Sequence, residues 1–309
     1  MRKREVVRRY VAGVLALFAG FAVTPHAAAF CRTSACELGE AGRRCSPEQE
    51  DDCGVPLYWK EPCLGFSVQR DGLPDLSADA FAELVELAFA TWAGADCDGA
   101  RPRFVVKRQP DAACASPEHN VDRNVDFGNA NVVMFRNDDW PYPEREDVLG
   151  LTTITFDTET GEIHDADIEI NTHEFLFTWS DTGVSYDLLS TLVHEAGHFL
   201  GISHSDLAES VMNAKPLLGS LEHRELAADD VAAICDAYPP GATEITATCS
   251  PLPHDFAPEC DQELPAAPEH EVGRGCSAAP ARALGGPPAL FIAIGVLVLA
   301  RWRRGGGAR

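Results

Sequence analysis

The chain has 309 residues, which is long enough for one catalytic domain with additional segments at both ends. Its 48 acidic residues outnumber 25 basic residues, and the formal net charge is −23. A chain this acidic repels polyanions, so nucleic acid is excluded as a partner. The composition is that of a soluble, exported globular protein.

The first 29 residues have the pattern of a signal peptide. Basic residues between Arg2 and Arg9 precede an apolar run over 11–23, and Ala27, Ala28 and Ala29 form a small-residue cleavage site. A membrane anchor is the competing interpretation, but the apolar run is short. Residues 1–29 therefore predict export, to the extracellular space or to the cell surface.

Eleven cysteines fit that oxidising compartment. Without Cys276, which belongs to the C-terminal tail, ten remain, an even number compatible with five disulfides whose pairing the sequence leaves open. The stretch 30–56 is rich in cysteine and poor in periodicity. It is interpreted as a cysteine-rich N-terminal extension stapled by disulfides.

Residues 57–241 predict a single α+β domain. Ser77 is a suitable cap for a helix over 78–93, whose apolar residues recur on one face. Alternating or continuous apolar runs predict strands at 64–69, 104–107, 132–135, 149–156 and 163–171. A tight turn at 158–161 joins the last two, and 109–129 is predicted to be a polar loop.

A metal site is the strongest functional signal. His194 and His198 are four residues apart, so on a helix they lie on one face. Gly201 can adopt the left-handed conformation that ends the helix and returns His204 as a third ligand. Three imidazoles leave the fourth position of a tetrahedral Zn²⁺ to water, as in catalytic sites. Glu195 follows the first ligand and is the candidate general base and acid.

The pattern H-E-x-x-H-x-x-G-x-x-H, followed by Met212, resembles the metzincin zinc endopeptidases, in which the methionine forms a turn beneath the imidazoles. The serine that follows the third histidine, Ser205, makes the motif similar to that of the matrixin branch. The resemblance implies a twisted, mostly parallel sheet with one antiparallel edge strand, a long zinc helix and a C-terminal helix. In that family the strand equivalent to 149–156 is an open edge, along which a protein or peptide substrate binds extended.

The resemblance also implies a hydrophobic preference just after the cut bond, in a pocket walled by 213–226. The stretch 137–141 and Thr153 lack the histidines of the structural zinc found in vertebrate matrixins, so one catalytic zinc is expected. Asp157, His164, Asp165 and Asp167 are interpreted as solvated hairpin residues, with a calcium site as the alternative. Cys53 partly resembles the cysteine of the matrixin propeptide switch, but a structural disulfide is favoured.

The C-terminal part changes in composition. Residues 242–275 are interpreted as a mostly disordered stalk rich in proline and acidic residues, in which Cys249 and Cys260 close a loop. Within 276–309, Cys276, an apolar block over 289–300 and an arginine cluster resemble the sorting tail of myxobacterial surface proteins. A plain membrane anchor is the alternative, but the block is shorter than the roughly twenty residues that a span needs.

The sequence thus predicts a monomeric, secreted or cell-surface zinc endopeptidase in which Glu195 activates water. The alternative is a surface adhesion or binding module that keeps the fold but has little catalytic activity. The intact Glu195 argues against it, because a retired active site is free to lose its base.

Overall fold

The computed structural model describes residues 30–35, 55–113, 117, 130–142, 148–215, 218–241 and 249–251, together with the backbone of one C-terminal strand. In chain order the elements are β1 (Cys63–Val68), α1 (Ala78–Ala93), β2 (Val105–Arg108), β3 (Val132–Phe135), β4 (Gly150–Phe156), β5 (Ile163–Ile170), β6 (Phe177–Thr178), β7 (Tyr186–Asp187), α2 (Leu188–Phe199), the 3₁₀ turn η1 (Glu222–Arg224), α3 (Ala228–Ala237) and β8 (Val296–Leu299).

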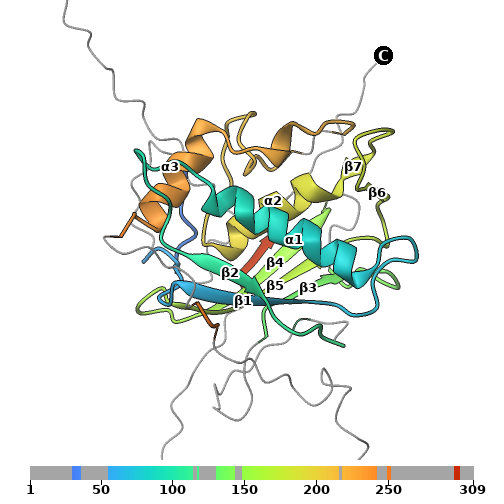
Figure 1. Cartoon of the computed structure of the whole chain (residues 1–309), viewed down its shortest axis with the longest axis horizontal. Coiled ribbons are helices and arrows are strands. Elements are labelled where there is room, and N and C mark those ends of the chain that lie inside the picture. Colours follow the sequence, from blue (N-terminus) through green and yellow to red (C-terminus); the bar gives the residue numbers. More distant parts are fainter. Residues whose placement is uncertain are drawn as a thin grey trace, which may run out of the picture.

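The larger sheet has the strand order β2-β1-β3-β5-β4-β8. Strands β2, β1, β3 and β5 run parallel, whereas β4 is antiparallel to β5. Helices α1 and α2 lie against each other on one face of this sheet (Figure 1). The predicted α+β fold, with a mostly parallel sheet, an antiparallel strand and a zinc helix, is confirmed.

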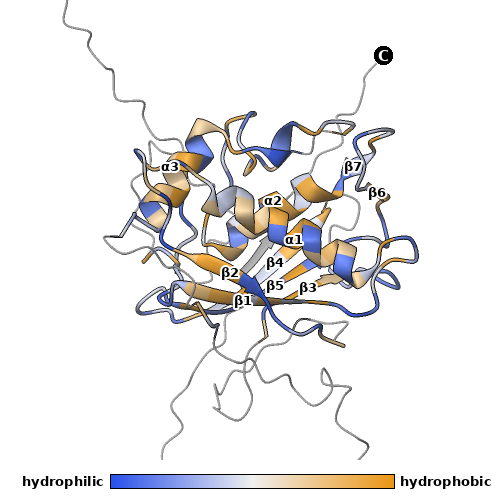
Figure 2. Cartoon of the chain, viewed as in Figure 1, coloured by the Kyte–Doolittle hydropathy of each residue, from blue (hydrophilic) through white to orange (hydrophobic). Residues whose placement is uncertain are grey.

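Helix α1 forms where its apolar spacing predicts. Ser77 caps it by accepting a hydrogen bond from the Ala80 amide at 3.2 Å. Its inner face buries Phe81, Val85 and Trp92, and the Trp92 indole donates to the Val193 carbonyl of α2 at 2.8 Å. Figure 2 shows hydrophobic residues along the strands beneath this helix and hydrophilic residues on its outer side. Burial of that face fixes α2, and therefore the zinc motif, over the sheet.

The outer edge of β4 is not open, contrary to expectation. Strand β8, from the apolar block of the tail, pairs antiparallel with it, from Leu151 opposite Leu299 to Ile154 opposite Val296. An unpaired edge presents a row of backbone donors and acceptors that another extended segment can complete. In the part of the chain that the structure describes, no helix has the length and apolar character to cross a membrane.

The start of the N-terminal extension is built into the domain. The Thr33 amide donates to the Gly201 carbonyl, and the Ser203 amide donates to the Cys31 carbonyl, both at 3.0 Å. Residues 30–35 therefore brace the loop that carries the third histidine. Cys53 lies outside the described residues, so the structure does not place it.

Two disulfides lie among the described residues, Cys63–Cys249 and Cys97–Cys235. The first shows that the expected loop between Cys249 and Cys260 is wrong, because Cys249 is bound to β1. The second ties the end of α1 to α3. Most of the predicted stalk and Cys276 fall outside the described residues.

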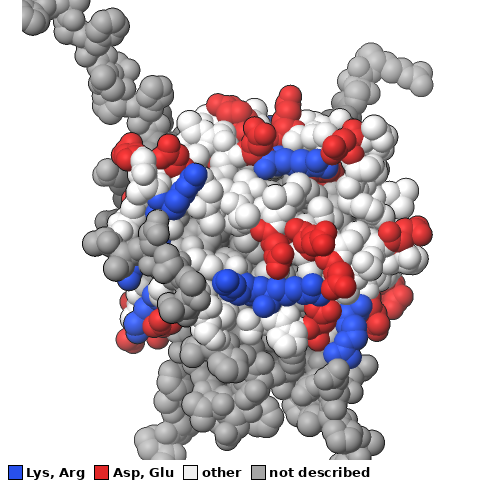
Figure 3. Space-filling model, viewed as in Figure 1, with Lys and Arg blue, Asp and Glu red and all other residues white. Residues whose placement is uncertain are grey.

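The acids of β5 are also not solvated. Asp165, Asp167 and Glu169 alternate along the strand on the sheet face opposite the helices, and all three are fully buried. Asp167 accepts a hydrogen bond from the Val132 amide at 2.8 Å, and Glu169 contacts Arg136. The interpretation as solvated hairpin residues is therefore wrong for Asp165 and Asp167, because neither side chain is exposed. The outer surface carries acidic side chains with basic ones beside them (Figure 3).

Candidate active site

Helix α2 presents two of the three histidines and ends where the motif requires. Asp187 caps its start, accepting from the Ser190 amide at 2.8 Å. After the last turn Gly201 has φ +80°, and a Cβ there would lie 2.6 Å from the Leu57 carbonyl oxygen. Only glycine fits that position without strain. The chain therefore reverses at Gly201 and brings His204 back toward the helix.

The three imidazoles converge through their Nε2 atoms. His198 Nε2 lies 3.1 Å from that of His194 and 3.1 Å from that of His204. Four ligands around Zn²⁺ at about 2.0–2.1 Å would be about 3.3 Å apart, so this spacing fits a tetrahedral zinc site. Among the described residues, the metal-ligating side chains that lie close enough together to hold a metal ion are those of His194, His198 and His204.

The protonation of the histidines also suits a metal. The Nδ1 atoms of His194 and His198 lie 2.7 Å and 2.9 Å from the carbonyl oxygens of Val211 and Ile202, so each Nδ1 carries the hydrogen. Burial lowers the pKa of His194 to about 3 and that of His198 well below its usual value. Both rings are therefore neutral and direct an Nε2 lone pair at the shared centre.

Glu195 is buried between α2 and β4. Burial raises the pKa of its carboxyl to about 8, and a hydrogen bond from Thr152 acts in the opposite direction. Thr152 Oγ1 donates to Glu195 Oε2 at 2.7 Å. A Cβ on Gly150 would lie 2.7 Å from Glu195 Oε1, so the missing side chain makes room for the carboxylate. Two residues on one face of β4 thus hold Glu195 in place.

The turn at Met212 packs against α2. Met212 is buried, and a Cβ on Gly197 would collide with its sulfur atom. Asp230 organises the turn, because its carboxylate accepts hydrogen bonds from Ser210 Oγ and from the Val211 amide. The Val211 carbonyl in turn holds the His194 ring. The Met212 turn therefore supports the site in two ways: it packs against Gly197 of α2, and its Val211 carbonyl holds the His194 ring.

Sequence reasoning missed three parts of this site. Asp230, in the first turn of α3, supports the Met212 turn from 18 positions further along the chain. The pair of Gly150 and Thr152 was not singled out, although strand alternation places both on the face toward α2. The ion pair of Asp187 and Arg224 could not be found, since 36 residues separate its partners in the chain.

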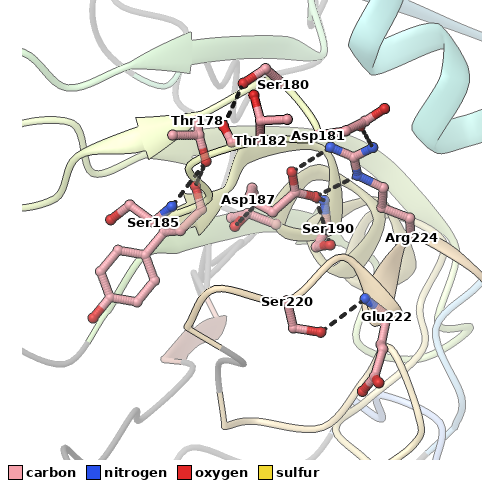
Figure 4. Close-up of polar contacts among 12 residues, drawn as sticks. Thr178, Ser180, Asp181, Thr182, Ser185, Asp187, Ser190, Ser220, Glu222 and Arg224 are labelled. Carbon is pink, nitrogen blue, oxygen red and sulfur yellow. Dashed lines mark hydrogen bonds and ion pairs between the residues drawn. The ribbon is translucent and has the colours of Figure 1, made fainter.

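A pocket adjoins the His194 ring on the side of the N-terminus of α2. Arg224, from η1, points both nitrogens of one guanidinium edge at Asp187 and reaches Asp181 with another nitrogen (Figure 4). These bonds raise the pKa of Arg224, so it stays charged. The ion pair fixes the segment carrying η1 over the helix start, which closes one side of the pocket.

The comparisons with known proteins agree with this geometry. A family model described as Matrixin matches residues 58–239, which is more than half of the chain. The chain belongs to the matrixin family. Membership supports a metalloprotease and implies zinc, for which the three histidines are the consistent ligands.

The chain is also similar to one curated protein, human matrix metalloproteinase-26. It is 29% identical over 123 residues, a region that covers 38% of this matrixin and 44% of the human protein. The alignment thus spans less than half of that relative. The family match ends before the tail, so the resemblance of 276–309 to a sorting tail remains a prediction.

Proposed function

We propose that this matrixin is an exported zinc endopeptidase that cuts peptide bonds in proteins, with His194, His198 and His204 as metal ligands. One observation carries the proposal. Three imidazoles converge within ligand distance of one another, and the residue after the first of them, Glu195, is a buried carboxyl held by its own hydrogen bond. A purely structural metal site would have no use for that carboxylate.

The histidines His194, His198 and His204 would hold Zn²⁺, which as a Lewis acid would polarise the scissile carbonyl and acidify water. The positive charge of bound Zn²⁺ would lower the raised pKa of Glu195, so the ionised carboxylate would accept the proton of the attacking water and later donate it to the leaving amine. Thr152 keeps that carboxylate aimed at the centre throughout. The buried surroundings of Glu195 exclude bulk water, which strengthens these polar interactions.

An extended substrate would bind along the outer edge of β4, because Thr152 of this strand already touches the catalytic carboxylate. The same backbone groups pair with β8 in the structure. Substrate and the Val296–Leu299 segment therefore compete for one edge. Release of the tail, as the sorting-tail resemblance of Cys276 implies, would leave the edge to substrate.

We further place the protein outside the cytoplasm, as a monomer on or released from a bacterial cell surface. The signal-peptide pattern of residues 1–29 and the disulfides Cys63–Cys249 and Cys97–Cys235 support export. The apolar block and arginine cluster of the tail support membrane association. Calcium is left open as a second ion.

The decisive experiment compares the zinc-loaded protein with its Glu195→Ala variant on an unfolded generic protein substrate, with and without a zinc chelator. We expect cleavage by the parent protein, loss of cleavage on chelation, and loss in the variant with one zinc still bound. If the folded, zinc-loaded parent cuts nothing even after the tail is removed, the fold serves adhesion or binding instead.

A further inference from the structure

The turn that follows α2 supports two of the three histidines. His204 lies at its end, and the Ile202 carbonyl oxygen lies 2.9 Å from His198 Nδ1, so this carbonyl fixes the ring of a second ligand. The Ile202 amide donates back to the Gly197 carbonyl of α2, also at 2.9 Å. Groups that orient a ligating imidazole contribute strongly to metal affinity. Two imidazoles therefore depend on the backbone of this turn.

The outer edge of the turn is completed by residues 31–34, which we call the N-terminal strap. Arg32 pairs antiparallel with Ile202. The hydrogen bonds of this pairing are made by the residues on either side of Ile202, whose own amide and carbonyl point toward α2. The strap thus holds the turn on one side while Ile202 holds His198 on the other.

The strap is anchored to the rest of the domain along its second edge. The Leu57 amide donates to the Thr33 carbonyl at 2.8 Å. The Arg32 guanidinium donates to the Leu57 carbonyl at 2.6 Å and reaches Asp236 of α3, beside which this segment runs (Figure 1). The strap is therefore the middle one of three extended segments, between the start of the domain and the turn after α2.

The strap also belongs to the interior of the protein. Cys31 is 2% exposed and is part of a disulfide, and Thr33 is 7% exposed. In the described part of the extension, no residue lines the pocket beside His194. Loss of the strap would deprive the Gly201 carbonyl and the Ser203 amide of their hydrogen-bond partners. The strap thus supports the metal site without covering that pocket.

We propose that the N-terminal strap is a positioning segment of the zinc site, so that the extension begins with a retained, activating part of the protein. Its pairing with the turn keeps His204 and the Ile202 carbonyl where zinc ligation needs them. A propeptide that blocks a cleft acts in the opposite way, because its removal raises activity. The inference rests on the proposed zinc site and goes beyond the peptidase function, since it concerns metal retention.

The test is zinc affinity of the full-length protein, measured by competition with a colorimetric chelator. Thr33→Pro removes the amide that donates to the Gly201 carbonyl, and we expect zinc affinity to fall about 10- to 100-fold. Ala35→Pro is the matched control, because it removes an amide that donates to the Val55 carbonyl at 2.9 Å, on the side away from the turn. Its zinc affinity should stay within about twofold of the parent.

Amide exchange in the metal-free protein, followed by NMR, reports on the same contact without zinc. The Ser203 amide, which donates to the Cys31 carbonyl, should exchange faster in Thr33→Pro than in the parent or in Ala35→Pro. Neither measurement requires cleavage, so both test the strap even if the proposed peptidase function fails.

A second variant keeps the test open if Thr33→Pro does not fold, as judged by near-UV circular dichroism. Arg32→Met leaves the backbone pairing in place but removes the guanidinium that anchors the strap to the Leu57 carbonyl, so it should also weaken zinc binding. Parental zinc affinity in every folded strap variant, or an equal loss in Thr33→Pro and Ala35→Pro, would overturn the proposal.

Discussion

Replacement of Thr152 by valine removes one hydroxyl with little change of volume. That hydroxyl donates to Glu195 at 2.7 Å, and both side chains are almost fully buried. A hydrogen bond to a charged group contributes about 1.5–3 kcal/mol. If the bond is needed to aim the carboxylate during proton transfer, Thr152→Val should lower kcat about 10- to 150-fold. KM should stay the same, because the hydroxyl bonds to Glu195 rather than to substrate.

The assay is steady-state cleavage of a quenched fluorescent peptide, with zinc content measured on the same samples. Thr152→Ser keeps the hydroxyl and should recover most of the activity. Thr153→Val is the matched control, since its side chain points to the other face of β4. Normal zinc content with kcat within about twofold of the parent in Thr152→Val would refute the positioning role of Thr152.

Three other outcomes follow from the same geometry. Gly201→Ala places a Cβ 2.6 Å from a backbone carbonyl oxygen at a residue with φ +80°. We therefore expect the free energy of unfolding to fall by about 1–3 kcal/mol and zinc to be lost more readily to a chelator. Unchanged zinc retention would contradict the role of this turn. In the metal-free folded protein, the lowered pKa values keep His194 and His198 neutral, whereas the unfolded chain protonates both below pH 6.5. The free energy of unfolding should therefore fall by about 1.4 kcal/mol per pH unit for each imidazole as acid is added. The pKa of Glu195 is raised to about 8, so its effect on stability has the opposite sign, and the free energy of unfolding decreases as the pH rises toward 8. The urea midpoint of unfolding should therefore be highest near pH 6.5. A midpoint that rises steadily through pH 8 would argue against a buried, protonated carboxyl. Removal of residues 276–309 should raise kcat/KM for peptides by freeing the edge of β4; an unchanged value would show that β8 does not compete with substrate.

The local elements could be predicted because their signals are local. The helix α1, the strand β3 and the end of α2 at Gly201 follow from apolar periodicity, capping chemistry and the freedom of glycine. The metal ligands are equally local, since three histidines and their spacing lie within eleven residues. The predictions about export and the sorting tail rest on residues 1–29 and on Cys276 and the arginine cluster, which lie outside the described residues, and they stay predictions.

Contacts between distant segments could not be predicted. Cys249 pairs with Cys63 across most of the domain, and Asp165 and Asp167 are fully buried although they follow a surface turn. Neither fact has a signature in the residues next to these positions. Packing decides which acids meet solvent and which cysteines meet each other.

The sequence by itself determined the chemistry that we propose for this protein, because zinc ligation and proton transfer depend on residue types at helical spacing. Tertiary structure alone decided how that chemistry is supported and restricted. Thr152 reaches Glu195 because β4 lies beside α2, and Arg224 neutralises Asp187 because η1 folds back over the helix start. These contacts arise where the sheet, helix and loops are packed together, and they set the orientation of the Glu195 carboxyl and the position of η1 over the start of α2.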